Sequence, residues 1–234
     1  MLARRSAFPL VTLPLVLVLV AGDVLAAKGV IKDPTGGSGV GKGSIVVTEA
    51  FPPGPVEPGD VVEFAEPTHA EVGDLVSFDV GVEPSSGQPL AFHLALEMKG
   101  EVLSSVTVGN LTVGSNQSVL ITGGAVVDGK ISVNGGTLVV TDGVTIEGKI
   151  ESSGASAVII GGSSRIDGKV DSTGANALGI RDSAVDGKVY SSGDRTVLIS
   201  GSTIRGKLEV KNADACRVTN NTVEGKVDTP DCSR

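Results

Sequence analysis

The sequence predicts an all-β protein in which a small five-stranded barrel precedes a parallel β-helix of about seven coils. A short core, Asp167-Gly168-Lys169 in one copy, returns every 19 or 20 residues through the second half of the chain. A fixed period of this kind indicates a solenoid, and apolar residues that alternate with period two indicate strands. Five short apolar runs, separated by turns rich in proline and glycine, predict the barrel.

The first segment, residues 1–26, is predicted to be a secretory signal peptide. Arg4 and Arg5 form a charged start, an apolar run extends from Leu10 to Ala21, and small residues up to Ala26 form a cleavage site. The run is short for a membrane span, and a retained N-terminal anchor is the alternative. We expect an exported protein, either periplasmic, at the cell surface or secreted, with no stable membrane span after cleavage.

The mature chain is acidic and poor in aromatic residues. Removing residues 1–26 takes away two arginines and one aspartate, which moves the formal charge from −8 to −9. The chain has no Trp, one Tyr and five Phe. Nucleic acids require positive charge and planar rings, so we expect no nucleic-acid partner.

The barrel is predicted in two parts, a Gly-rich segment with the first strand at 27–44 and the remaining strands at 45–100. The apolar runs are Gly29–Ile31, Ser44–Thr48, Asp60–Ala65, Asp74–Val82 and Leu90–Glu97. A β-sandwich linker domain is the alternative. The stretch "GGSGVGKGS" approaches a phosphate-binding loop, but Gly43 stands where Ser or Thr would bind magnesium, and a strand follows instead of a helix. We interpret it as a flexible loop and predict no cofactor.

Two stretches of this domain, "KGVIKDPT" and "EVGDLVSFDVGVEPSSGQPLAFHLAL", resemble the first strand and the last two strands of a cold-shock domain. The resemblance implies a barrel of the oligonucleotide-binding type, which binds single strands through aromatic residues on its second and third strands. The corresponding stretches here are "GSIVVT" and "DVVEFA", where Phe64 is the one ring. Single-stranded nucleic-acid binding is therefore kept only as a second alternative function.

The β-helix is predicted over residues 101–234. Apolar pairs such as Ile146 and Ile150 flank each core glycine, and a second pair such as Val158 and Ile160 lies about ten residues beyond it. Stacked coils pair each backbone group with the coil above and below, about 4.8 Å away. Residues 102–232 resemble the right-handed parallel β-helix superfamily, which includes polysaccharide lyases, adhesins and polymer-forming scaffold proteins.

The core glycines are predicted to be structural. Gly148 lies on the inward face between Ile146 and Ile150, so glycine is expected where the coil narrows and no side chain fits. The series is Gly109, Gly129, Gly148, Gly168, Gly187, Gly206 and Gly225.

The lysines that follow these glycines are predicted to form an outward column, which is a candidate binding face for anions or a polysaccharide. They are Lys130, Lys149, Lys169, Lys188, Lys207 and Lys226. The alternative is a solvated, charge-balanced face, because an acid stands two residues before nearly every lysine. These acids are Asp128, Glu147, Asp167, Asp186 and Glu224, and we expect them to offset the repulsion within the lysine column.

The two cysteines, Cys216 and Cys232, are predicted to form one disulfide near the C-terminus, as is usual for an exported protein. A cross-link that closes about 15 residues stabilises a fold by about 3 kcal/mol. A buried free thiol at Cys216 is the alternative.

No catalytic or metal-binding residues are predicted. His69 and His93 have no Cys, Asp or His partner at ligand spacing. The alternative is a polysaccharide lyase or hydrolase that uses Asp167 and Asp186 with Arg181 or Arg205. Coils of uniform length leave no inserted loop to form the cleft that such an enzyme needs.

The sequence therefore predicts an exported, non-catalytic protein with a structural or ligand-presenting role. Its expected partner is a polysaccharide or envelope protein, or a second copy bound end to end. We expect the barrel to cover the N-terminal end of the rod, and the final segment "TPDCSR" to be too brief to cap much of the other end.

Overall fold

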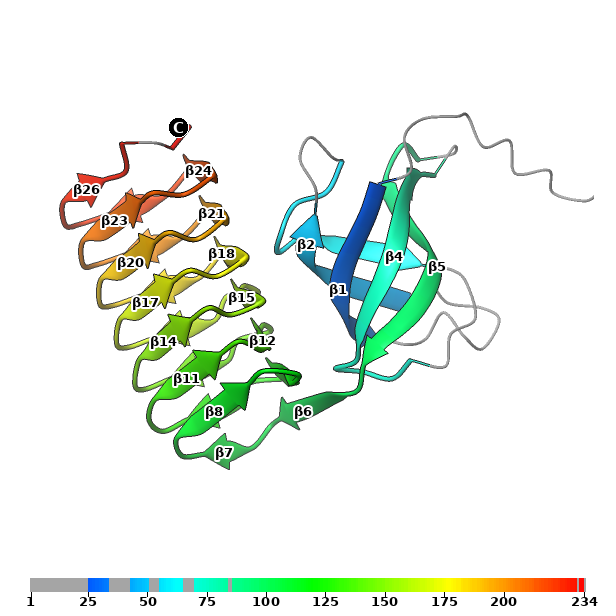
Figure 1. The fold of residues 1–234 in the computed structure, drawn as a ribbon. Coiled ribbons are helices and arrows are strands. Elements are labelled where there is room, and N and C mark those ends of the chain that lie inside the picture. Colours follow the sequence, from blue (N-terminus) through cyan, green and yellow to red (C-terminus); the bar gives the residue numbers. More distant parts are fainter. Residues whose placement is uncertain are drawn as a thin grey trace, which may run out of the picture.

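The computed structural model describes residues 25–33, 43–50, 55–64, 70–83, 86–230 and 232–233. Its regular elements are all β-strands, and they form a closed five-stranded barrel beside a parallel β-helix of seven coils (Figure 1). The predicted fold class is confirmed, whereas the right-handed winding stays a prediction. Most of the predicted signal peptide, the loop at 34–42 and His69 lie outside the described residues.

The barrel strands are β1 (Leu25–Asp33), β2 (Gly43–Ala50), β3 (Val61–Phe64), β4 (Leu75–Val82) and β5 (Pro89–Met98). They close in the order β1-β2-β3-β5-β4, with β3 parallel to β5 and the other pairs antiparallel. Alternation places Ile45 and Val47 in the barrel core with Phe64, while Val46 faces outward. Strand β1 begins two residues before the predicted mature start at Ala27, because Leu25 and Ala26 already pair with β4.

Each coil of the rod contributes three strands. The first coil holds β6 (Gly100–Ser104), β7 (Thr107–Val108) and β8 (Leu111–Gly114), and the second holds β9 (Ser118–Thr122), β10 (Val126–Val127) and β11 (Ile131–Asn134). The next three hold β12 (Thr137–Val140), β13 (Thr145–Ile146), β14 (Ile150–Ser153), β15 (Ala157–Ile160), β16 (Arg165–Ile166), β17 (Val170–Thr173), β18 (Ala177–Arg181), β19 (Ala184–Val185) and β20 (Val189–Ser192). The last two hold β21 (Thr196–Ser200), β22 (Thr203–Ile204), β23 (Leu208–Lys211), β24 (Ala215–Thr219), β25 (Thr222–Val223) and β26 (Val227–Asp228).

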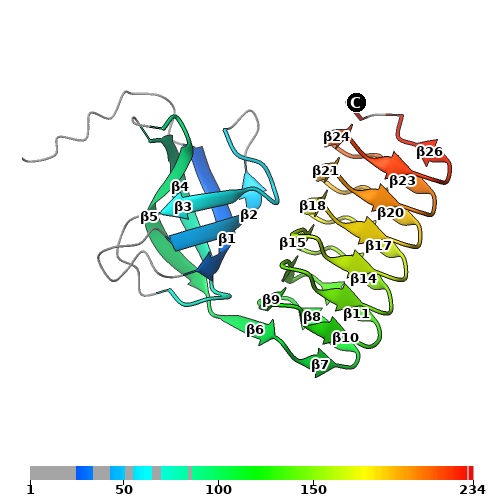
Figure 2. The ribbon, with the colours of Figure 1, turned by 180° about the vertical axis from the view of Figure 1, so that it is seen from behind.

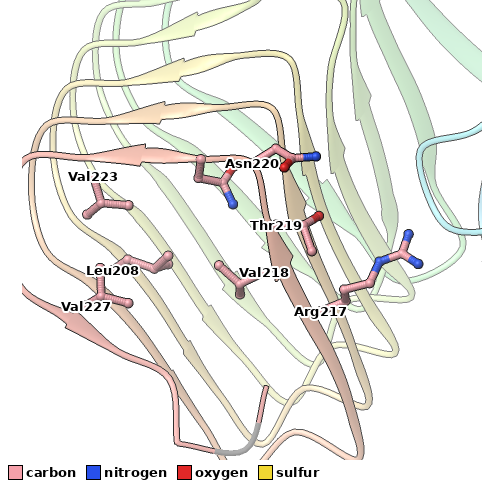
Figure 3. Close-up of a pocket in the computed structure, with 8 residues that line it drawn as sticks. Leu208, Arg217, Val218, Thr219, Asn220, Val223 and Val227 are labelled. Atoms are coloured by element: carbon pink, nitrogen blue, oxygen red, sulfur yellow. The ribbon is translucent and has the colours of Figure 1, made fainter. Parts of the chain in front are cut away.

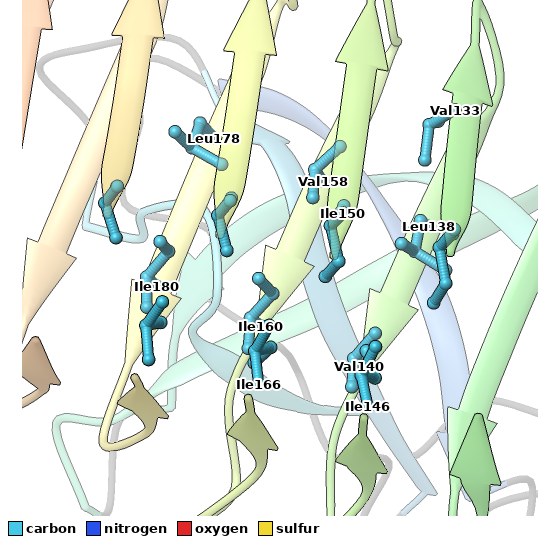
Figure 4. Packing of buried hydrophobic residues seen from close by; sticks show 14 of the residues in the cluster. Val133, Leu138, Val140, Ile146, Ile150, Val158, Ile160, Ile166, Leu178 and Ile180 are labelled. Atoms are coloured by element: carbon cyan, nitrogen blue, oxygen red, sulfur yellow. The ribbon is translucent and has the colours of Figure 1, made fainter. Parts of the chain in front are cut away.

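The strands stack into three parallel sheets of seven strands each. We call them the flank sheet (β6-β9-β12-β15-β18-β21-β24), the short sheet (β7-β10-β13-β16-β19-β22-β25) and the lysine sheet (β8-β11-β14-β17-β20-β23-β26). Corresponding residues pair from coil to coil, so Val140, Ile160 and Ile180 occupy one column inside the rod (Figure 4). The predicted inward pairs are fully buried in one aliphatic core.

The three corners of each coil explain the recurring turn residues. At two corners one or two residues per coil have a left-handed backbone, and there Gly, Asn, Asp and Ser are used, as at Asp142 (φ 60°) and Asn212 (φ 54°). The third corner, between the short and lysine sheets, holds the predicted glycines. A Cβ on Gly148 would lie 2.0 Å from the carbonyl oxygen of Gly129 in the preceding coil. Close approach of the coils therefore excludes a side chain, except at Gly109 in the first coil, where the space is open.

The barrel lies against the flank sheet (Figure 1, Figure 2), which corrects the expectation that it would cover the N-terminal end of the rod. Outward residues of the flank sheet, including Leu120, Val139 and Ile159, are buried with Val30 and Val46 of the barrel. These strands are apolar on both faces, as in "TLVV" and "AVII". A strand whose two faces are both covered has this composition.

Polar contacts hold the two domains together. Between described residues, ion pairs cross the boundary and join Lys32 with Asp142, Asp60 with Arg181, and Glu57 with Arg217. At the junction the buried Asp74 carboxylate accepts hydrogen bonds from Lys99 Nζ (2.8 Å) and Gly100 N (2.9 Å). Burial raises the pKa of Asp74, but hydrogen bonds from the Glu71 amide, Lys99 and Gly100 hold it below its usual value. The rod thus starts from a fixed point on the barrel.

The predicted disulfide between Cys216 and Cys232 is confirmed, with the two Cα atoms 4.5 Å apart. The alternative of a free thiol at Cys216 is therefore wrong. Cys216 belongs to β24, and both cysteines pack against the core of the rod.

A column of residues inside the lysine sheet changes from valine to serine in the middle of the rod. In register it holds Val113, Val133, Ser152, Ser172, Ser191 and Val210. The Ser191 hydroxyl donates to the buried Asp194 (2.6 Å), whereas the hydroxyls of Ser152 and Ser172 have no hydrogen-bond partner among the described residues.

We therefore expect Ser172→Val to raise the free energy of unfolding by about 1 kcal/mol. The substitution removes an unsatisfied buried hydroxyl and adds buried methyl groups of the kind that the outer coils already accommodate. Urea denaturation measures the change. Ser153→Val, on the exposed side of the same sheet, is the control and should leave stability nearly unchanged. Equal or lower stability of Ser172→Val would show that the hydroxyl is satisfied.

Candidate functional site

The six predicted lysines lie in one column, each directly before the first residue of a strand of the lysine sheet. Their backbone is fixed by the ladder between coils, since the amide of Ile131 donates to the carbonyl of Lys149 (2.9 Å) and the pattern repeats along the rod. We call this column, with the outward residues of the lysine sheet beside it, the lysine face.

The acids that pair with the lysines are not those predicted. Glu151, two residues after Lys149, lies 2.6 Å from Lys149, 3.1 Å from Lys130 and 3.4 Å from Lys169. Lys149 and Glu151 stand on either side of Ile150 and point to the same outward side of the lysine sheet. Glu147 precedes the corner at Gly148 and belongs to the side of the short sheet. Hydrogen bonds from Lys149 and Lys130 lower the pKa of Glu151 to about 2.

Two of the remaining coils repeat this pairing. Lys169 contacts Asp171 at 2.6 Å, and Lys207 contacts Glu209 at 2.8 Å. In the coil between them Tyr190 takes the place of the acid, and the Lys188 ammonium lies 4.7 Å from the centre of its ring. Lys188 therefore makes a cation–π contact where its neighbours make ion pairs.

The two carboxylates of the alternative catalytic site, Asp167 and Asp186, lie at the corner between the short and lysine sheets, on the side of the short sheet. Asp167 accepts from Arg165 (2.6 Å), and Asp186 accepts from Arg165 and from Arg205 (2.6 Å). Arg181 does not join them, because it pairs with Asp60 at the barrel. The arrangement is an exposed ladder of ion pairs, and neither carboxylate lines one of the observed hollows.

Hydrogen bonds from Lys207 and Lys211 lower the pKa of Glu209 to about 2 as well. The low pKa values of Glu151 and Glu209 predict that the stability of the fold depends on pH. A carboxyl whose pKa is lower in the folded state stabilises the fold above its ordinary value of 4.5, and this contribution is lost as the pH falls towards 2. We expect Glu151→Gln with Glu209→Gln to reduce the loss of thermal stability between pH 4.5 and 2. Glu147→Gln, from the other acidic column, is the control. An identical acid profile for the double variant and the wild type would contradict the prediction.

A hollow with a volume of about 640 Å³ lies at the C-terminal end of the rod. Leu208, Val218, Val223 and Val227 point toward the middle of the last coil, whereas Arg217 points outward (Figure 3). Here the aliphatic interior of the rod meets solvent. Among the described residues that line the hollow, Arg217 alone is ionisable, and it pairs with Glu57. These residues therefore offer apolar contact but no acid–base group.

The described residues contain no group of three or more His, Cys, Asp or Glu placed to hold a metal ion. His93 is exposed, and its Nδ1 lies 2.9 Å from Asp79 on the neighbouring strand. In the part of the chain that the structure describes, no helix is long and apolar enough to span a membrane. Models of known families, curated proteins and solved structures give no match to this chain.

Three features of the surface were not predicted. The apolar outward row of the flank sheet could have been predicted from the sequence. The run from Val158 to Ile160 is apolar at every position instead of alternating, which indicates a strand that is buried on both faces. The pairing of lysines with later acids could have been read from "KIES", "KVDS" and "KLEV", which repeat an acid at i+2. The cation–π contact depends on the single Tyr190, which no repeat marks.

Proposed function

We propose that the protein is an exported, non-catalytic structural element whose rigid rod presents the lysine face to an anionic polysaccharide or another envelope component. The observation that supports this best is the uniformity of the seven coils. Each is built from the same three short strands, so no loop rises from the described surface to enclose a cleft. A regular, extended face suits a regular, extended partner.

The charge of the lysine face supports an anionic partner. Six lysines recur at about the coil spacing of 4.8 Å, in a chain whose net charge is −8. Four acids of the same face, Glu151, Asp171, Glu209 and Asp228, leave it with a positive balance. Beside Lys188, the position that is acidic in the preceding coil is occupied by Tyr190, whose ring contacts the lysine. Such a face attracts polyanions with an affinity that falls as salt rises.

Retention on an immobilised polyuronate tests this proposal. Lys169→Gln, Lys188→Gln and Lys207→Gln together should lower the salt concentration that elutes the protein. Arg165→Gln, Arg195→Gln and Arg205→Gln together remove the same charge from other faces and form the matched control. Equal elution of the two triple variants would count against the lysine face, and release of shortened polymer that Asp167→Asn with Asp186→Asn abolishes would favour the lyase or hydrolase.

Export is part of the proposal. The predicted signal peptide supports it, and so does the disulfide, which persists in oxidising compartments. Fractionation should find the mature protein outside the cytoplasm with an N-terminus at Ala27. Alkylation without reduction should leave both cysteines unmodified.

We further propose that the barrel is of the oligonucleotide-binding type, as its five strands and the resemblance to cold-shock domains suggest. Such barrels bind single strands on the face of their second and third strands. Here Val46, the outward residue of β2, is buried against the rod with Val30. We therefore propose a bracing role for the barrel and expect no salt-dependent retention of single-stranded DNA.

A second candidate function is association of rods through their ends. The C-terminal hollow, with its aliphatic lining and exposed strand edges, favours it. Molar mass measured over a concentration series tests this function.

A further inference from the structure

Within the described residues, the last coil of the rod is covered on one of its three sheets only. Ser233 lies beside β24, where its carbonyl accepts from the Val218 amide (2.9 Å) and its amide donates to the Cys216 carbonyl (3.0 Å). In the described residues β25 pairs with β22 alone and β26 with β23 alone. The C-terminal segment is thus a partial cap, in agreement with the expectation that it is too brief to cover much of the end.

The disulfide holds this cap in place. Cys216 stands in an inward column of the flank sheet, and Cys232 lies next to the residue that pairs with β24. Thr229, at the start of the segment, is buried. Without the covalent link, two backbone hydrogen bonds and one from the Ser233 hydroxyl to the Cys216 carbonyl would hold residue 233. Short terminal segments held by so few contacts fray readily.

Opening the cap would leave an end with three unpaired strand edges around the apolar hollow. Val227 is already 39% exposed there. Strand edges and aliphatic side chains are best covered by another set of edges with the same cross-section. A second copy of this rod provides such a set.

The N-terminal end of the rod is not a suitable partner for the C-terminal end. Glu101 of β6 pairs with Val119, so it occupies the inward column that continues through Leu138, Val158, Leu178, Val197 and Cys216. A head-to-tail contact would enclose this carboxylate over the apolar core without a partner, which is costly. Inward charges of this kind protect sheet edges from association.

We propose that residues 229, 230, 232 and 233 form a disulfide-held latch on a self-association surface, and that the open C-terminal end binds the same end of a second copy. The inference rests on the proposed association through rod ends. It adds that the partner is a second copy, that identical ends meet, and that the disulfide controls the contact. A dithiol reductant opens the latch, giving two cysteine thiols while the dithiol becomes a disulfide. Contact between identical ends is symmetric and closes as a dimer instead of extending into a filament.

The experiment compares molar mass by light scattering, over a concentration series, for three samples of the mature chain. These are the oxidised protein, the same protein in dithiothreitol, and Cys216→Ser with Cys232→Ser. The oxidised protein should stay monomeric, while the other two should reach twice the monomer mass. Circular dichroism of each sample checks that the rod remains folded. If the double variant fails this check, a chain ending at Pro230 with Cys216→Ser replaces it.

Two further variants test the contact itself. Val223→Asp in the open-latch background should return the mass to that of a monomer, whereas Thr203→Asp, on the outward side of the neighbouring coil, should not. Glu101→Val in the open-latch background should extend dimers into larger assemblies. Monomers in every sample would overturn both the end association and the latch. Equal association of oxidised and reduced protein would overturn the latch alone.

Discussion

Replacing Gly148 by alanine is expected to destabilise the protein by about 3 kcal/mol, which is a large fraction of the stability of most domains. The added Cβ would lie 2.0 Å from the carbonyl oxygen and 2.4 Å from the carbonyl carbon of Gly129. Both are backbone atoms, so no rotation of a side chain can relieve the clash. The two coils must move apart, which weakens the hydrogen bonds between them.

Gly109→Ala is the matched control, because this glycine lies at the same corner in the first coil and a Cβ there meets nothing within 4 Å. Urea denaturation of both variants measures the difference. We expect Gly109→Ala to change the free energy of unfolding by a few tenths of a kcal/mol at most. Similar losses for the two variants would mean that backbone freedom, and not contact between coils, accounts for the conserved spacing of these glycines along the rod.

Replacing Ile159 by aspartate is expected to separate the barrel from the rod. Ile159 points outward from the flank sheet, yet it is 2% exposed because Val30 and Val46 of the barrel cover it. An unpaired carboxylate at this position costs several kcal/mol while the barrel stays docked. The interior of the rod is untouched, so the coils should remain folded.

Small-angle scattering should show a larger radius of gyration for this variant, and limited proteolysis should cut faster between the domains. Thr145→Asp is the control, since Thr145 points outward from the short sheet, where the barrel is absent. An unchanged radius and cleavage pattern for Ile159→Asp would show that the ion pairs alone hold the barrel in place.

The rod could be predicted from the sequence because its repeat is local. Each coil shows the same glycine and the same alternation, as at Gly168 and Gly187, and stacking is the one arrangement that satisfies every unit at once. The barrel strands were predicted within a few residues for the same reason, since turn residues bound each apolar run.

The position of the barrel and the ion pairs between barrel and rod could not be predicted in this way. Contacts such as Lys32 with Asp142 join residues far apart in the chain, and no periodicity records them. The lysine partners were assigned to Glu147 and its equivalents from sequence order, although strand geometry favours Glu151. The cap depends on the disulfide, whose effect on the edge of β24 appears only when the last coil is placed.

The contact between barrel and rod has a consequence for how the protein unfolds. In an ordinary solenoid each repeat touches only its neighbours, so terminal repeats melt independently of the middle. Here the Ser118 hydroxyl of the second coil bonds the Gly73 carbonyl, and Arg217 of the seventh coil pairs with Glu57. The barrel therefore contacts the rod from the second coil to the seventh. Because both ends of the rod are held by the same domain, we expect the distant coils to unfold as one cooperative unit.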